Sequence, residues 1–87
     1  MLKAWKNEIV WEKHKSFHEI VGAVKENGFE VRGYREYVSK TDVLLEKDGI
    51  QIVMPVYNDC AIDVEGYVRD VIHLWELKRD IAALQKG

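Results

Sequence analysis

The chain has 87 residues, 47 % of them hydrophobic and 32 % charged, a balance that indicates one globular domain over 1–87 and excludes a disordered chain. The one cysteine, Cys60, excludes an intrachain disulfide, and we expect a cytoplasmic protein in a reducing compartment. The net charge of −2 disfavours nucleic acid, because phosphate contacts call for a basic excess. No apolar run approaches the roughly 20 residues of a membrane span, so we expect no membrane partner.

Residues 1–15 form an N-terminal extension that fits two structures. Leu2, Trp5 and Ile9 have helical spacing, whereas the stretch Glu8–Glu12 suits a short strand. Two tryptophans, Trp5 and Trp11, fall in this extension. Because tryptophan carries a large apolar surface, we expect both to be covered by the core or by a partner.

A first helix is predicted from about Phe17 to Asn27. Ser16 followed by Glu19 matches a capping box, in which the serine accepts from a free amide of the first turn. Gly28 then supplies the left-handed conformation that commonly closes a helix. Between these signals, apolar residues recur at helical spacing: Ile20, Val21 and Val24.

Three strands are expected after this helix. The first covers Phe29–Arg32 and Tyr34–Val38, with Gly33 at a bend or bulge. The second is Val43–Glu46, followed by a turn at Lys47-Asp48-Gly49 in which Gly49 takes a positive φ. The third alternates from Ile50 to Tyr57, and its Pro55 suits an edge strand.

The last predicted helix begins after Asp63, a plausible N-cap. Its apolar residues form one stripe with a spacing of three or four: Tyr67, Val71, Leu74, Leu77, Ile81 and Leu84. Val64, Val68, Ile72 and Trp75 widen this stripe. A stripe this wide predicts that the helix packs on the sheet and on something else, either the N-terminal extension or a second copy of the chain.

These elements predict an α+β domain of order α-β-β-β-α, with a three-stranded antiparallel sheet and helices on one face. From Ser16 to about Leu74 the chain resembles the HicA-type toxin family of small mRNA interferases, which have a double-stranded-RNA-binding-domain-like fold. The resemblance lies in four features: Lys25-Glu26-Asn27-Gly28-Phe29, the Asp48-Gly49 turn, Ile52-Val53-Met54-Pro55-Val56 and Asp63 to Ile72.

The catalytic residues of that family do not carry over. The family's second strand holds a Gly-Ser-His, but the matching stretch here is Ser39-Lys40-Thr41, so Thr41 stands in place of the histidine. A threonine hydroxyl does not titrate near neutral pH and cannot act as a general acid or base. Tyr57 likewise stands where the family often has another histidine. The resemblance therefore implies a fold relative without the nuclease machinery.

For the histidines and the cysteine, which could in principle ligate a metal or act as a nucleophile, we predict ordinary structural roles. His14 and His18 have a metal-ligand spacing but no third ligand, and we interpret them as surface residues. His73 is expected to be partly buried. Cys60 lies near Asp59 and Asp63, which would raise its pKa, so we expect an inert thiol. No cofactor or metal site is predicted.

Two surfaces are candidates for binding. One consists of acidic residues near two loops, and we count the extension's tryptophans among the same protein-binding candidates: Glu46, Asp48, Asp59, Asp63, Glu65, Trp5 and Trp11. The other combines basic and aromatic residues of the first strand: Arg32, Tyr34, Arg35 and Tyr37. A core tyrosine and arginines paired with Glu30 and Glu36 would also explain this pattern.

The sequence favours a non-catalytic binding module that acts through protein contacts, for example a phage-type inhibitor that covers a nuclease or a defence protein. The acidic set would make those contacts. One alternative is a HicA-like RNA-binding domain using Arg32, Arg35, Lys40 and Thr41. A second alternative is a homodimer formed through the C-terminal helix.

Overall fold

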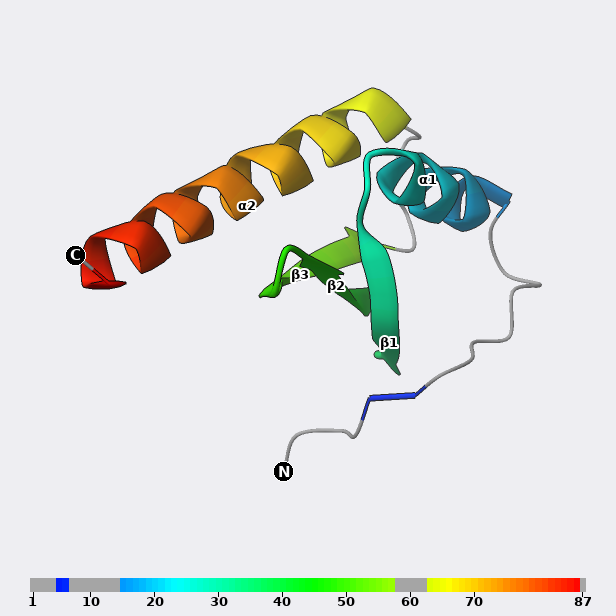
Figure 1. Cartoon of the computed structure of the whole chain (residues 1–87). Helices are drawn as coiled ribbons and strands as arrows, with labels where there is room; N and C mark the ends of the chain where they lie inside the picture. Colours follow the sequence, from blue (N-terminus) through cyan, green and yellow to red (C-terminus); the bar gives the residue numbers. More distant parts are fainter. Residues whose placement is uncertain (1–4, 7–14, 58–62, 87) are drawn as a thin grey trace.

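The computed structural model describes residues 5–6, 15–57 and 63–86 (Figure 1). One antiparallel sheet has the strand order β1-β2-β3, and both helices lie on one side of it (Figure 1). The predicted α+β class and the order α-β-β-β-α are confirmed. The elements are α1 (Lys15–Glu26), β1 (Glu30–Glu36), β2 (Lys40–Lys47), β3 (Ile50–Tyr57) and α2 (Val64–Lys86).

The start of α1 differs from the prediction, whereas its end agrees. The helix begins at Lys15, so Ser16 lies in the first turn and not at the cap; lysine is a good helix former and extends the helix before the serine. At the other end Gly28 has φ 92°. The Gly28 amide donates to the Lys25 carbonyl (3.0 Å) and the Phe29 amide to the Val24 carbonyl (3.3 Å). This pair of bonds is a Schellman motif.

The irregularity predicted at Gly33 is a β-bulge in β1. Val31 is opposite Leu45 and Gly33 is opposite Leu44, which leaves Arg32 as the extra residue. A Cβ on Gly33 would lie 2.9 Å from the Cβ of Trp5. Only glycine therefore lets residues 5–6 approach the strand this closely.

Residues 5–6 extend the sheet at its β1 edge. Lys6 and Tyr34 exchange two backbone hydrogen bonds of 2.8 Å, an isolated antiparallel bridge. Lys6 is thus extended, and the strand predicted as one alternative at Glu8–Glu12 lies outside the described residues. The other residues named for the extension, including Leu2, Ile9 and Trp11, lie outside the described residues.

The turn between β2 and β3 has positive φ at both central residues, 53° at Asp48 and 78° at Gly49. That combination is a type I′ turn, the tightest hairpin connection compatible with strand twist. It fixes the register, so that Thr41, Val43 and Leu45 point to the helices. β3 forms the other edge of the sheet and contains Pro55, as the sequence predicted.

The hydrophobic core lies between the sheet and the two helices. Its most completely buried side chains are Ile20, Val24, Val43, Leu45 and Ile52. α2 joins this core through Val71 and Trp75, which expose only 4 % and 7 % of their surface. The Trp75 indole Nε1 donates to the Lys47 carbonyl at 3.0 Å, which attaches the middle of α2 to the β2–β3 hairpin.

α2 begins at the predicted cap and is longer than the sheet. The Asp63 carboxylate accepts from the Gly66 amide at 2.9 Å, as an N-cap should. The helix has 23 residues and a length of about 35 Å. A strand of 8 residues covers only about 26 Å. The C-terminal part of α2 accordingly runs out past the sheet (Figure 1).

Candidate functional site

Glu46, the first residue of the predicted acidic surface, is held in an ion pair. Its carboxylate accepts from Arg32 at 2.6 Å (Nη2) and 3.2 Å (Nε), and from the Gln51 amide at 3.1 Å. These hydrogen bonds lower the pKa of Glu46, and the same pair raises the pKa of Arg32. Arg32 also lies 3.1 Å from Glu30, so one guanidinium links β1 to β2, and the Glu46 carboxylate is engaged within the fold.

The remaining acidic positions do not form one cluster. Asp48 is exposed in the hairpin turn, whereas Asp63 caps α2 and Glu65 lies in its first turn. The hairpin meets α2 at Trp75, 12 residues beyond Asp63, or about 18 Å along the helix. Asp59 and Trp11 lie outside the described residues.

The residues of the RNA-binding alternative are engaged within the fold. Thr41 is buried, with 8 % of its surface exposed. The Arg35 guanidinium lies over the Trp5 ring at 3.9 Å from its centroid, and Lys40 lies 3.4 Å from the Asp42 carboxylate. With Arg32 bound to Glu46, these four positions do not present a shared cationic surface.

Tyr34 and the histidines complete the positions singled out by sequence. Tyr34 is in the core, as one reading of the basic and aromatic residues on the first strand expected, and burial raises its pKa. His18 is exposed, as predicted for a surface residue, and His73 is exposed too, although partial burial was expected. Within residues 5–6, 15–57 and 63–86, no three His, Cys, Asp or Glu side chains gather as metal ligands. His14 and Cys60 lie outside these ranges.

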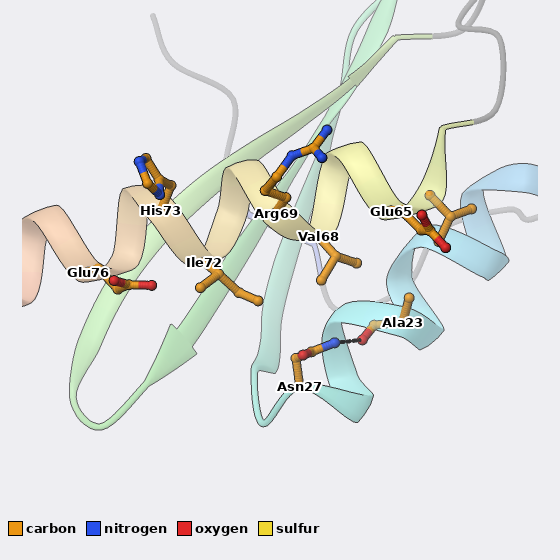
Figure 2. Close-up of a pocket in the computed structure, with 9 residues that line it drawn as sticks. Ala23, Asn27, Glu65, Val68, Arg69, Ile72, His73 and Glu76 are labelled. Atoms are coloured by element: carbon orange, nitrogen blue, oxygen red, sulfur yellow. Dashed lines mark hydrogen bonds between the residues drawn. The ribbon is translucent and has the colours of Figure 1, made fainter.

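A groove of about 480 Å³ lies between α1 and α2. Its floor is apolar and includes Ala23, Val68 and Ile72. Figure 2 shows Val68 and Ile72 directed toward α1, with Arg69 and His73 on the outer side of α2. The rim carries charges of both signs, so the groove does not select one class of ligand by charge.

The largest apolar exposure lies on the opposite side of α2. In the part of the chain that the structure describes, seven large hydrophobic side chains are exposed, and all but Val38 belong to β3 or α2. A pocket of about 310 Å³ joins these two elements, because Val53, Tyr57 and Leu74 line it together. We call the six residues the β3–α2 apolar surface: Val53, Tyr57, Leu74, Leu77, Ile81 and Leu84.

The four α2 members of this surface form one stripe. They are spaced by three, four and three residues, which at 100° per residue places them within an arc of about 80°. Exposure is 39 % at Leu74, 57 % at Leu77, 54 % at Ile81 and 80 % at Leu84. The single stripe predicted by sequence is therefore two surfaces: a buried one around Val71 and Trp75, and this exposed one.

Sequence reasoning placed the contact surface on carboxylates and treated Val53 and Tyr57 only as strand residues. Two signals in the sequence point to the apolar surface instead. The predicted third strand is an edge strand because of Pro55, and its helix neighbour has apolar residues for more than one turn beyond what a strand of that length can cover.

Neither described helix combines the length and the apolar character that crossing a membrane requires. Comparison with protein families, with curated proteins and with solved structures found no match. The resemblance to HicA-type toxins thus remains a prediction.

Proposed function

We propose that this protein is a non-catalytic binding module that acts through protein contacts at the β3–α2 apolar surface. The observation that carries the proposal is the exposure of Leu77, Ile81 and Leu84, each above half of its surface, in one line on an ordered helix. A contiguous apolar patch on a folded domain typically marks an interaction site. Burying one such side chain is worth about 1.5–3 kcal/mol.

Contact through acidic mimicry, as in a phage-type inhibitor of a nuclease, is less well supported. Such an inhibitor needs free carboxylates that imitate phosphates. Glu46 is neutralised by Arg32 and Asp63 is occupied as a helix cap. The RNA-binding alternative is also less well supported, because it needs free basic groups that contact phosphates. Arg32 and Lys40 are paired with carboxylates, and Thr41 is buried.

Affinity capture from cells of the source organism tests the proposal. The baits are the tagged chain, Ile81→Glu and Ala83→Glu, each used with nuclease-treated and untreated lysate. Ala83 is an exposed residue of the same helix. It lies about 160° around the helix from Ile81 and about 100° from Leu84, the nearest member of the stripe, which makes Ala83→Glu a matched control for the added charge.

We expect the wild-type chain and Ala83→Glu to retain the same protein after nuclease treatment, and Ile81→Glu to lose it. That protein includes the untagged chain itself, where the cells produce it. Recovery that depends on intact RNA would overturn the proposal and favour the RNA-binding alternative. Equal recovery by Ile81→Glu would show that the contact lies elsewhere.

A further inference from the structure

We infer that the β1 edge of the sheet is an acceptor site for an extended peptide that carries an aromatic residue, and that Trp5 and Lys6 fill this site from within the chain. The site is separate from the β3–α2 apolar surface. Three features support the inference: backbone pairing at Tyr34, a close approach at Gly33 and stacking on Arg35.

Tyr34 pairs with an extended backbone as it would with a strand-adding peptide. Its carbonyl accepts from the Lys6 amide and its amide donates to the Lys6 carbonyl, both at 2.8 Å. These bonds use backbone atoms alone, so they suit any residue that has an amide hydrogen. When a peptide adds to a sheet edge, such main-chain pairing gives affinity and the side-chain contacts give specificity.

The acceptor edge is short and is bounded at both ends. On one side, the β-bulge at Arg32 interrupts the regular strand. On the other side, the Tyr37 amide turns back to donate to the Lys40 carbonyl at 2.8 Å. An added peptide therefore pairs along residues 33–36, a stretch that suits a few extended residues and not a long strand.

The β3 edge does not offer an equivalent site. Pro55 has no amide hydrogen to donate, and the Gln51 carbonyl accepts from the Lys78 ammonium at 3.0 Å. Both features reduce pairing with another strand. The β1 edge is therefore the side on which this sheet takes up a further extended segment.

Gly33 holds the added segment close to the strand. A Cβ at this position would lie 2.9 Å from the Cβ of Trp5 and 3.3 Å from the Lys6 carbonyl oxygen. Both contacts are closer than a real Cβ normally makes, so any side chain here would push the backbone of the added segment away. Glycine instead leaves a recess, and the first side-chain atoms of the aromatic residue fill it.

Arg35 recognises the aromatic ring. The bridge between Lys6 and Tyr34 places Trp5 opposite Arg35. Because Tyr34 points into the core, alternation puts the Arg35 side chain on the face of the sheet away from the helices. Its guanidinium lies 3.9 Å from the centroid of the Trp5 ring, a cation–π contact that tryptophan, tyrosine or phenylalanine can make.

The segment supplied by the chain itself leaves hydrogen-bonding capacity unused beside the ring. Among the described residues, Arg35 Nε and Oδ1 of its cross-strand neighbour Asp42 are buried without a hydrogen bond. The Lys40 ammonium lies 3.4 Å from this oxygen, longer than a good hydrogen bond. Because unmade buried hydrogen bonds cost stability, a peptide that accepts from Arg35 or donates to Asp42 fits better than Trp5 and Lys6. We therefore expect such a peptide to displace them.

Fluorescence anisotropy with a labelled peptide tests the inference. The probe has the sequence of residues 1–10 and is titrated with the full chain, with Lys6→Pro and with Lys6→Pro combined with Gly33→Ala. Lys6→Pro removes the amide that donates to Tyr34 within the chain and so opens the site. It should bind the probe at least about tenfold more tightly than the wild type. Adding Gly33→Ala should abolish this binding, because the new Cβ fills the recess.

The same proline has the opposite effect in the probe. A peptide carrying Lys6→Pro should bind none of the chains, because it cannot donate to the Tyr34 carbonyl. Trp5→Ala is a second opening variant that leaves the backbone of the chain unchanged, and it should also bind the original probe more tightly. Lys6→Pro combined with Gly22→Ala, where a Cβ meets nothing within 4 Å, is the matched control and should bind like Lys6→Pro. Circular dichroism checks that every variant is folded.

Two results would overturn the inference. If neither Lys6→Pro nor Trp5→Ala binds the probe more tightly than the wild type, the chain's own segment does not compete for the site. If the proline-containing peptide binds as well as the original probe, backbone pairing is not used. Ile81→Glu should leave probe binding unchanged while it removes capture at the β3–α2 apolar surface, so this inference and the proposed function fail separately.

Discussion

The two halves of α2 both carry apolar residues at helical spacing but have opposite surroundings. In the first half Val71 and Trp75 are almost completely buried against the sheet and α1, whereas in the second half Leu77, Ile81 and Leu84 are more than half exposed. Apolar residues at helical spacing thus predict a contact but not its partner. Here the length of the neighbouring strands decides which apolar residues of α2 are buried, because the sheet ends where the β2–β3 hairpin meets Trp75.

The junction between the halves is a cluster around Trp75. Its indole donates to the Lys47 carbonyl at 3.0 Å and is in edge contact with Phe29, 6.4 Å between ring centroids. Lys47 and Arg79 lie over the indole ring at 4.8 and 5.0 Å. We expect this cluster to fix the angle of the whole helix, including the part beyond the sheet.

The largest effect should come from breaking the junction. Trp75→Ala removes a buried aromatic side chain and its hydrogen bond, and should lower the free energy of unfolding by about 3–5 kcal/mol. Leu84→Ala, in the exposed half, should change it by less than about 0.5 kcal/mol in dilute solution. Urea denaturation followed by circular dichroism measures both. Equal losses would mean that both halves of α2 belong to the core.

A smaller effect is expected at the start of the buried half. A Cβ on Gly66 would overlap the Asp63 carboxylate, so Gly66→Ala should break the cap and cost about 1 kcal/mol, as should Asp63→Ala. Glycine to alanine in a helix normally stabilises by about the same amount. Gly22→Ala in α1, where a Cβ meets nothing within 4 Å, is the matched control and should stabilise. Stabilisation by Gly66→Ala would contradict the cap.

The smallest effect is expected at the ion pair between Arg32 and Glu46, and it depends on pH. Glu46 has a lowered pKa because it accepts hydrogen bonds from Arg32 and Gln51. Its contribution is therefore complete above the ordinary carboxyl pKa and is lost as pH falls through the folded-state value. Glu46→Gln should be less stable than the wild type at pH 7, and the difference should shrink below about pH 4.

The control for this titration is Glu26→Gln, an exposed carboxylate of α1. Its stability at pH 7 should stay close to that of the wild type, because a substitution at an exposed position usually has little effect. A difference at Glu46 that is constant from neutral to acid pH would show that the ion pair does not contribute to folding.

Local signals predicted most of the fold. Asp63, Gly28 and the Asp48-Gly49 turn act through nearby backbone, so their residue types alone identify the two helix ends and the hairpin. The start of α1 was misplaced because a capping-box match at Ser16 says nothing about the helical preference of the residue before it. The order and pairing of the strands followed from alternation.

The candidate site was predicted less well because it depends on contacts distant in sequence. The sequence predicted that the Glu46 carboxylate is free to bind a partner. In the structure, the bulge at Arg32 places the guanidinium within hydrogen-bonding distance of that carboxylate. Thr41 looked accessible, but the hairpin register turns it to the core. In the sequence, the apolar residues of the buried and exposed halves of α2 belong to one periodic stripe. No local signal shows where burial ends.

Amide hydrogen exchange along α2 in dilute protein tests the central claim most directly. We predict that amides 67–75 are strongly protected, because the core holds them. Amides 78–86 should exchange at least about tenfold faster, as expected for a helix end without tertiary contacts. Equal protection of both halves would contradict the claim that the second half is an exposed contact surface.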